Sequence, residues 1–157
     1  MLRPATRPTS KRLAFGPAAF SLALCASAVS AQDNGQIETV FRKVSSAEAT
    51  IVKAIGAGDS RQLSKTGSEL GRIIEAALQR RENGGSVTSC DMAAHSLAFL
   101  AVSAADGLAN KGERRRLLIE DARAAASDFQ KDMAACEKQA GKNTGSHTSV
   151  EKALRAL

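Results

Sequence analysis

The sequence has no tryptophan and no tyrosine, and its aromatic residues are five phenylalanines. Only Phe41, Phe99 and Phe129 lie beyond residue 31. Proteins that bind single-stranded nucleic acid usually stack the bases on aromatic side chains. The sequence therefore offers no stacking platform, and we expect no nucleic-acid partner.

Cysteine and histidine are also scarce, with three and two residues, and no Cys-x-x-Cys-His motif for covalent haem occurs. A zinc site needs three or four converging ligands. The nearest approach is Asp91, Met92 and His95, one helical turn apart, although a partly buried His95 beside an aspartate at a helix start explains the same residues. No phosphate loop or catalytic motif stands out. We expect no metal ion, no cofactor and no enzymatic activity.

The first 31 residues read as a signal peptide. Residues 1–12 carry four basic side chains and no acid, residues 13–29 are almost all apolar or small, and Val29-Ser30-Ala31 supplies small side chains for cleavage after Ala31. A mitochondrial transit peptide has a similar acid-free start, an uncleaved anchor is the second alternative, and lipidation at Cys25 is the third, which the bulky Leu24 before it disfavours. The compact apolar block favours secretion, and Gly16-Pro17 interrupts the span that an anchor needs.

The leader accounts for most of the net charge. It holds four of the 22 basic residues and none of the 16 acidic ones, so the remaining 18 and 16 give +2 where the whole chain has +6. The high pI therefore does not indicate a nucleic-acid surface. We predict a periplasmic or secreted protein, with membrane contact only through the signal peptide during export.

Apolar residues recur at steps of three, four and seven, the period of amphipathic helices. We predict an all-α fold: a small up-and-down bundle of about four helices plus a short C-terminal helix, with residues 32–140 as the bundle domain. A helical hairpin that completes its core with a second copy is the alternative. Residues 141–157 are predicted to be a flexible linker, with His147 solvated, and a short amphipathic helix capped by Thr148 and Glu151. The predicted long helices are 36–55, 60–82 after the N-cap Asp59, 90–109 and 113–139.

Cys90 and Cys136 are the two cysteines beyond the leader, and they fall near one end of the predicted hairpin of the third and fourth long helices. Counting from its turn leaves an axial offset of about 4.5 Å, which an asymmetric turn absorbs. Because exported proteins meet an oxidising environment, we predict a disulfide. Two buried free thiols are the alternative.

The third long helix carries a second apolar stripe of Met92, His95, Phe99 and Val102, opposite the side that holds Cys90. A helix that is apolar all round must be covered on both sides. Self-burial is the favoured interpretation, by a central position of this helix or by the C-terminal piece folding back. The other is an interface, most simply with a second copy.

Arg114, Arg115 and Arg116 form the densest charge run, at the bundle end that also receives Lys53, Arg61, Lys65 and Lys111. A solvated face with partners at Glu113 and Glu120 is the favoured interpretation, because surface charge runs usually contribute little. Docking to an acidic surface is the alternative.

Together these features predict an exported non-enzymatic helical protein, a module for protein–protein interaction or for envelope structure, whose partner is another protein or a second copy. The alternative is a small-ligand or metal-binding bundle that uses the interior near His95.

Overall fold

The structure, a computed structural model, describes residues 26–157 of the 157-residue chain, with side chains from residue 34 onward. Most of the predicted signal peptide lies outside the described residues, and the predicted cleavage point falls inside the first helix. The described chain folds into five helices without a strand: α1 Ala26–Ala57, α2 Ser60–Glu82, α3 Ser89–Ala109, α4 Gly112–Ala140 and α5 Ser149–Arg155.

This confirms the predicted all-α, up-and-down bundle. The helix starts follow capping chemistry that is readable in the sequence. The Asp59 side chain accepts a hydrogen bond of 2.9 Å from the backbone N–H of Gln62 at the start of α2. At α3, Thr88 and Asp91 form a reciprocal capping box. The predicted box of Thr148 and Glu151 at α5 is wrong, because Thr148 makes no side-chain cap there.

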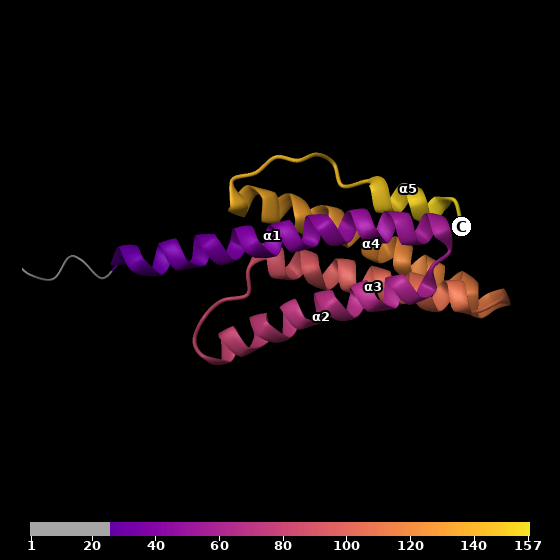
Figure 1. Cartoon of the computed structure of the whole chain (residues 1–157), viewed down its shortest axis with the longest axis horizontal. Coiled ribbons are helices and arrows are strands. Elements are labelled where there is room, and N and C mark those ends of the chain that lie inside the picture. Colours follow the sequence, from indigo (N-terminus) through magenta and orange to yellow (C-terminus); the bar gives the residue numbers. More distant parts are fainter. Residues whose placement is uncertain (1–25) are drawn as a thin grey trace, which may run out of the picture.

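The helices form two layers (Figure 1). One layer holds α2, α3 and α4, with α3 in the middle; the other holds α1, which packs over this layer, and α5, which packs on α1 and α4. Small residues let α3 approach its neighbours closely. A Cβ atom added at Gly107 would lie 2.6 Å from Cδ1 of Ile119 in α4, and one added at Gly67 in α2 would lie 2.9 Å from Cγ2 of Val102.

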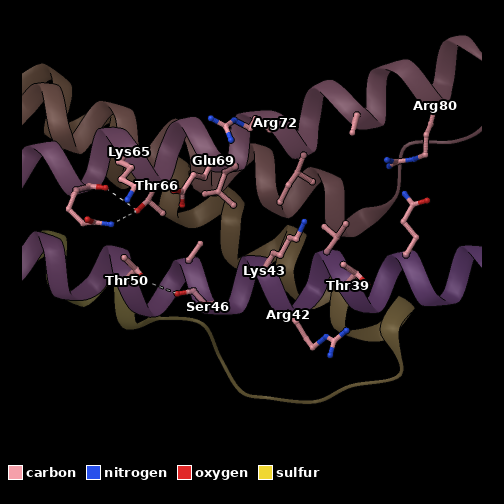
Figure 2. Close-up of a pocket in the computed structure, with 17 residues that line it drawn as sticks. Thr39, Arg42, Lys43, Ser46, Thr50, Lys65, Thr66, Glu69, Arg72 and Arg80 are labelled. Atoms are coloured by element: carbon pink, nitrogen blue, oxygen red, sulfur yellow. Dashed lines mark hydrogen bonds between the residues drawn. The ribbon is translucent and has the colours of Figure 1, made fainter.

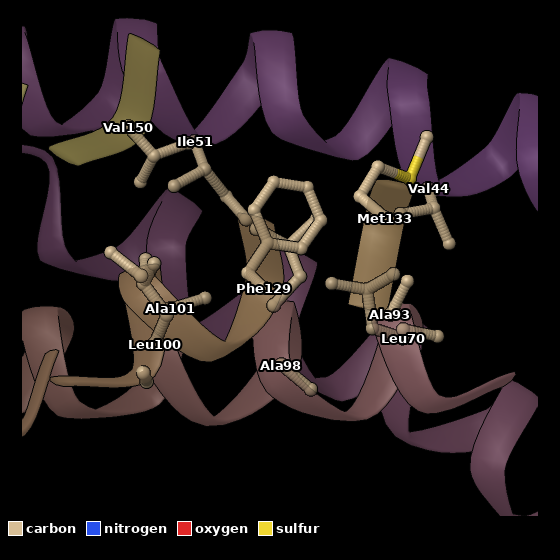
Figure 3. Packing of buried hydrophobic residues seen from close by; sticks show 14 of the residues in the cluster. Val44, Ile51, Leu70, Ala93, Ala98, Leu100, Ala101, Phe129, Met133 and Val150 are labelled. Atoms are coloured by element: carbon tan, nitrogen blue, oxygen red, sulfur yellow. The ribbon is translucent and has the colours of Figure 1, made fainter. Parts of the chain in front are cut away.

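The core runs the length of the bundle between the two layers. Phe129 and Met133 of α4 are fully buried against Val44 and Ile51 of α1, and Val150 of α5 closes the same cluster (Figure 3). Within the described residues α3 alone is long and apolar enough by composition to cross a membrane, and it is mostly buried within the bundle, as the core helix of a folded domain is.

Cys90 and Cys136 confirm the predicted pairing. Their sulfur atoms are at bonding distance, and their Cα atoms are 4.5 Å apart. The bridge joins the start of α3 to the end of α4, so it ties together the open end of this hairpin.

His147 is not solvated, and the prediction that it is was wrong. Its side chain is only 8% exposed and lies between two buried glutamates, with Nδ1 2.7 Å from Glu48 of α1 and Nε2 3.0 Å from Glu137 of α4. The ring also meets Phe129 edge-on, with centroids 6.0 Å apart. Thr144 donates from its backbone N–H and its hydroxyl to Glu137. We call Glu48, Glu137 and His147 the clasp.

The clasp explains how the short helix α5 stays docked on the bundle. Ser149, the first residue of α5, donates a 2.6 Å hydrogen bond to Glu48, and Val150 and Leu154 are fully buried. A helix of this length has little stability alone, so packing and these polar bonds hold it in place. Whether residues 141–148 are flexible remains a prediction about motion.

Candidate functional site: the groove between α1 and α2

A groove of about 920 Å³ runs between α1 and α2 (Figure 2). These two helices pack less closely against one another than α3 does against α4. The groove extends from Gln36 to Thr50 along α1 and from Gln62 to Arg80 along α2. Its stretch of α1 is about 21 Å long at 1.5 Å per residue, or four helical turns. We call this feature the α1–α2 groove.

Apolar side chains from both helices form the floor of the groove. They lie at the edges of the apolar sides that α1 and α2 turn toward the core. These edges remain uncovered because the two helices diverge. Leu70 is buried, whereas Ala47 and Ile73 are only partly buried against the core. The apolar lining residues are Val40, Ala47, Leu70, Ile73 and Ala76.

Positive charge lies along both rims. Lys43 points across the groove toward α2, while Arg42 points away from it (Figure 2). Lys65 and Arg72 stand on α2, two turns and so about 10.5 Å apart. Glu69 is the only acidic residue that lines the groove. None of these four cationic side chains enters an ion pair within the part of the chain that the structure describes.

The fifth lining cation has a structural task. The Arg80 guanidinium donates to the buried Asp91 carboxylate at 2.7 Å, and it also donates to the side-chain oxygen of Gln36 when that amide is oriented to satisfy both groups. Asp91 in turn receives the backbone N–H and the hydroxyl of Thr88. Arg80 therefore closes one end of the groove and is not available to a ligand there.

The hydroxyl groups of the groove are largely satisfied by their own helices. Thr39 donates to the Gly35 carbonyl at 2.8 Å, Thr50 to the Ser46 carbonyl at 3.0 Å, and Thr66 to the Gln62 carbonyl at 2.9 Å. Such back-bonded hydroxyls do not act as nucleophiles without a base beside them. No histidine or cysteine lines the groove. Its chemistry is that of a binding surface with an apolar floor and cationic rims.

The candidate metal ligands do not come together. Asp91 is committed to Arg80 and Thr88, and the side chain of His95 is exposed, not partly buried as the sequence suggested. Within residues 26–157 no group of three or more His, Cys, Asp or Glu side chains is placed to hold a metal ion. The small-ligand alternative therefore shifts from the interior near His95 to the α1–α2 groove.

The structure corrects the favoured interpretation of the second stripe on α3. Met92, Phe99 and Val102 are 44%, 54% and 43% exposed, and His95 is exposed as well. Helix α3 is central in its layer, yet α1 covers only its inner side. The other possible cover, the C-terminal helix, packs on α1 and α4 instead. The protein thus leaves the stripe bare.

Arg114, Arg115 and Arg116 have different surroundings. Arg116 pairs with Glu113 and Glu120, and Arg115 donates to the carbonyl of Leu157 at 3.4 Å. Glu113 raises the pKa of Arg116, and Arg116 lowers that of Glu113. Arg114 remains exposed. The favoured interpretation, a solvated face with local partners, fits Arg116, and docking to an acidic surface stays untested.

Sequence reasoning missed the groove. The signal was present in the spacing of outward basic residues on the second helix, because Lys65 and Arg72 stand seven apart and so share a face. The missing knowledge was that this face turns toward Lys43 of α1. Helix periodicity gives the direction of a side chain on its own helix but does not say how far apart two neighbouring helices stand.

Comparison with known proteins gives no further guidance. No protein-family model matches the chain, and neither the curated proteins nor the solved structures include a significant match.

Proposed function

We propose that the protein is an exported, non-enzymatic interaction module that holds an acidic amphipathic helix of a partner protein in the α1–α2 groove. The observation that carries the proposal is the combination of an apolar floor with unpaired cations on both rims. Recognition of an amphipathic helix in a groove uses an apolar floor for affinity and charged rims for orientation and specificity. Export rests on the leader sequence and is compatible with the disulfide.

The spread of charge favours a helix over an amphiphile with one anionic head. Such an amphiphile would need cations gathered at one end of the groove. Here Lys65 lies toward the end of the groove where α1 and α2 join, Arg72 lies two turns farther along α2, and Lys43 faces them from α1. A helix with carboxylates every seven residues presents one charge per two turns, which matches the spacing of Lys65 and Arg72. Four turns of groove accommodate the i, i+4, i+7 and i+11 anchors of such a helix.

The test is binding of a labelled acidic amphipathic peptide to the exported protein, followed by fluorescence anisotropy. A peptide with the same apolar residues but lysines in place of its carboxylates should not bind. Lys43→Glu combined with Arg72→Glu should weaken binding of the acidic peptide at least tenfold, because each cation that faces a carboxylate becomes a repulsive charge.

A matched control is Lys53→Glu combined with Arg61→Glu, which makes the same charge change on the same two helices outside the groove. This pair should bind the acidic peptide nearly as the parent does. Equal losses of affinity in both double variants would show that the effect comes from net charge alone and would overturn the proposal. Direct binding of an anionic amphiphile, with no binding of either peptide, would establish the small-ligand alternative in its place.

A further inference from the structure

The described residues include five large apolar side chains that are exposed. Three of them, Met92, Phe99 and Val102, follow one another along α3. The other two, Leu78 of α2 and Leu117 of α4, lie on the helices that flank α3. We call the surface formed by Met92, His95, Phe99 and Val102 the α3 face.

Contacts on either side fix which way the α3 face points. Ser96 of α3 donates to Asp132, so that edge of α3 meets α4. Gly67 of α2 lies against Val102 and Ala98, so the other edge meets α2. At 100° per residue the stripe falls between these edges and opposite the residues that pack on α1. The α3 face is therefore the outer surface of the three-helix layer.

We propose that a second copy of this chain covers the α3 face, with the two α3 helices antiparallel about a two-fold axis. Contiguous apolar patches on soluble proteins commonly mark interaction sites. Met92, His95, Phe99, Val102 and Asp106 follow at steps of three, four, three and four, which is the spacing of a coiled-coil seam. Such a seam packs against another helix of the same kind.

The charges along the seam select the partner and its register. In an antiparallel pair related by a two-fold axis, the sequence numbers of any two residues that face each other add up to the same value. Setting Phe99 opposite Val102 of the second copy sets His95 opposite Asp106 of that copy, and the symmetry repeats both pairs. An imidazole then faces a carboxylate twice, while the apolar side chains meet at the centre. The stripe is self-complementary in this register, as an isologous interface requires.

The surroundings of the α3 face argue against a lipid surface as its cover. Asp106 ends the stripe, and Asp121, Asp128 and Asp132 follow one another along the edge of α4 beside it. Anionic headgroups attract basic segments and would be repelled by this edge. A small, apolar patch of this kind supports a weak and reversible dimer. The α1–α2 groove lies on the other side of α2 and stays open in each copy.

Single cysteines read out the register under mild oxidation once Cys25 is replaced by serine, because the buried Cys90 and Cys136 are already paired. In the proposed arrangement two Val102→Cys side chains are offset by about 4.5 Å along the helix axis, whereas two Met92→Cys side chains are offset by about 25 Å. We expect a rapid crosslink for Val102→Cys and none for Met92→Cys. Crosslinks in both variants would show a parallel pair, and none in either would rule out this register; both results overturn the proposal.

Sedimentation over a wide range of concentration tests the dimer itself. The parent should show reversible dimers, and Phe99→Glu should be monomeric with an unchanged circular dichroism spectrum, because Phe99 is 54% exposed in the monomer. Ala49→Glu, at an exposed site on α1 away from the face and outside the groove, should leave the dimer intact. Asp106→Lys should weaken the dimer, because His95 of the second copy loses the carboxylate that it faces. A parent that sediments as a monomer at every concentration would refute the proposal.

Discussion

The pair α1 and α2 and the pair α3 and α4 are both antiparallel helical hairpins with short turns, yet one stays open and the other closes. Where α3 meets α4, the contact is made by small residues such as Gly107, and a disulfide joins the far end. Where α1 meets α2, Lys43 faces α2, and Lys65 and Arg72 stand on its rim. Closing the hairpin would remove these cations from water and bring like charges closer together, and both changes cost free energy. The facing side chains thus decide whether a hairpin forms core or groove.

The largest expected effect breaks the closed pair. Replacing both Cys90 and Cys136 by alanine opens a loop with a sequence separation of 46 residues. In the chain-entropy model such a loop contributes on the order of 4 kcal/mol to the free energy of unfolding. We expect a loss of about that size in chemical denaturation of the oxidised parent against the double variant. The reduced parent should resemble the variant, and equal stability of all three samples would refute the prediction.

The disulfide also illustrates which features of the fold can be predicted from the sequence. The bounds of α2, α3 and α4, the cap at Asp59 and the pairing of Cys90 with Cys136 follow from local rules and from the count of residues around one turn, whereas α1 begins at Ala26, ten residues before its predicted start. These features depend on neighbours in the chain or on a single hairpin register. The width of the α1–α2 groove depends on four helices at once, since α3 sets where α2 lies and α4 helps to set where α1 lies.

The second prediction compares the same substitution in the two hairpins. Ala104→Leu adds three carbon atoms to α3 at a site with no exposed surface, and overpacking there should cost about 2 kcal/mol. Ala47→Leu adds the same atoms to the floor of the α1–α2 groove, where the extra apolar area covers open surface. We expect this variant to stay within about 0.5 kcal/mol of the parent. Thermal unfolding of both variants measures the difference, and similar losses would show that the groove closes in solution.

The clasp is the polar link between the two hairpins, since Glu48 belongs to α1 and Glu137 to α4. The sequence alone could not place it, because His147 is 99 residues from Glu48 and stands in a segment that is rich in Gly, Ser and Thr. Composition predicts solvent exposure for such a histidine. The folded chain brings two buried carboxylates to either side of it, and a buried charge needs a partner of opposite sign.

The smallest expected effect is a pH dependence that the clasp imposes on this link. Burial by itself lowers the pKa of His147, but the hydrogen bonds and charges of Glu137 and Glu48 outweigh it and raise the pKa above its ordinary value of 6.5. Burial raises the pKa of Glu137, while Thr144 and His147 outweigh it and bring the pKa below its ordinary 4.5. Lys152 is the other charged residue that lines the pocket at His147.

The sign of the effect follows from these directions. A histidine with a raised pKa stabilises the fold fully below the unfolded value near 6.5 and loses that contribution as the pH rises through its folded pKa, because a neutral ring donates to one carboxylate only. A glutamate with a lowered pKa stabilises the fold above about 4.5 and loses its contribution as the pH falls. The clasp should therefore be strongest between these values, and the start of α5 should loosen above neutral pH.

His147→Asn tests this with little backbone strain, since asparagine tolerates the positive φ of 50° found at this position. The variant should be less stable by about 1 kcal/mol at mildly acidic pH, because a hydrogen-bonded cation is lost, and it should approach the parent as the pH rises. Hydrogen exchange of the α5 amides should show the same trend. His95→Asn, measured at a dilution where the chain is monomeric, should keep the pH dependence of the parent, because His95 is exposed in the monomer. A parent whose α5 protection does not change between pH values on either side of neutrality would refute the role of the clasp, because loss of the proton from His147 is the change that should loosen α5.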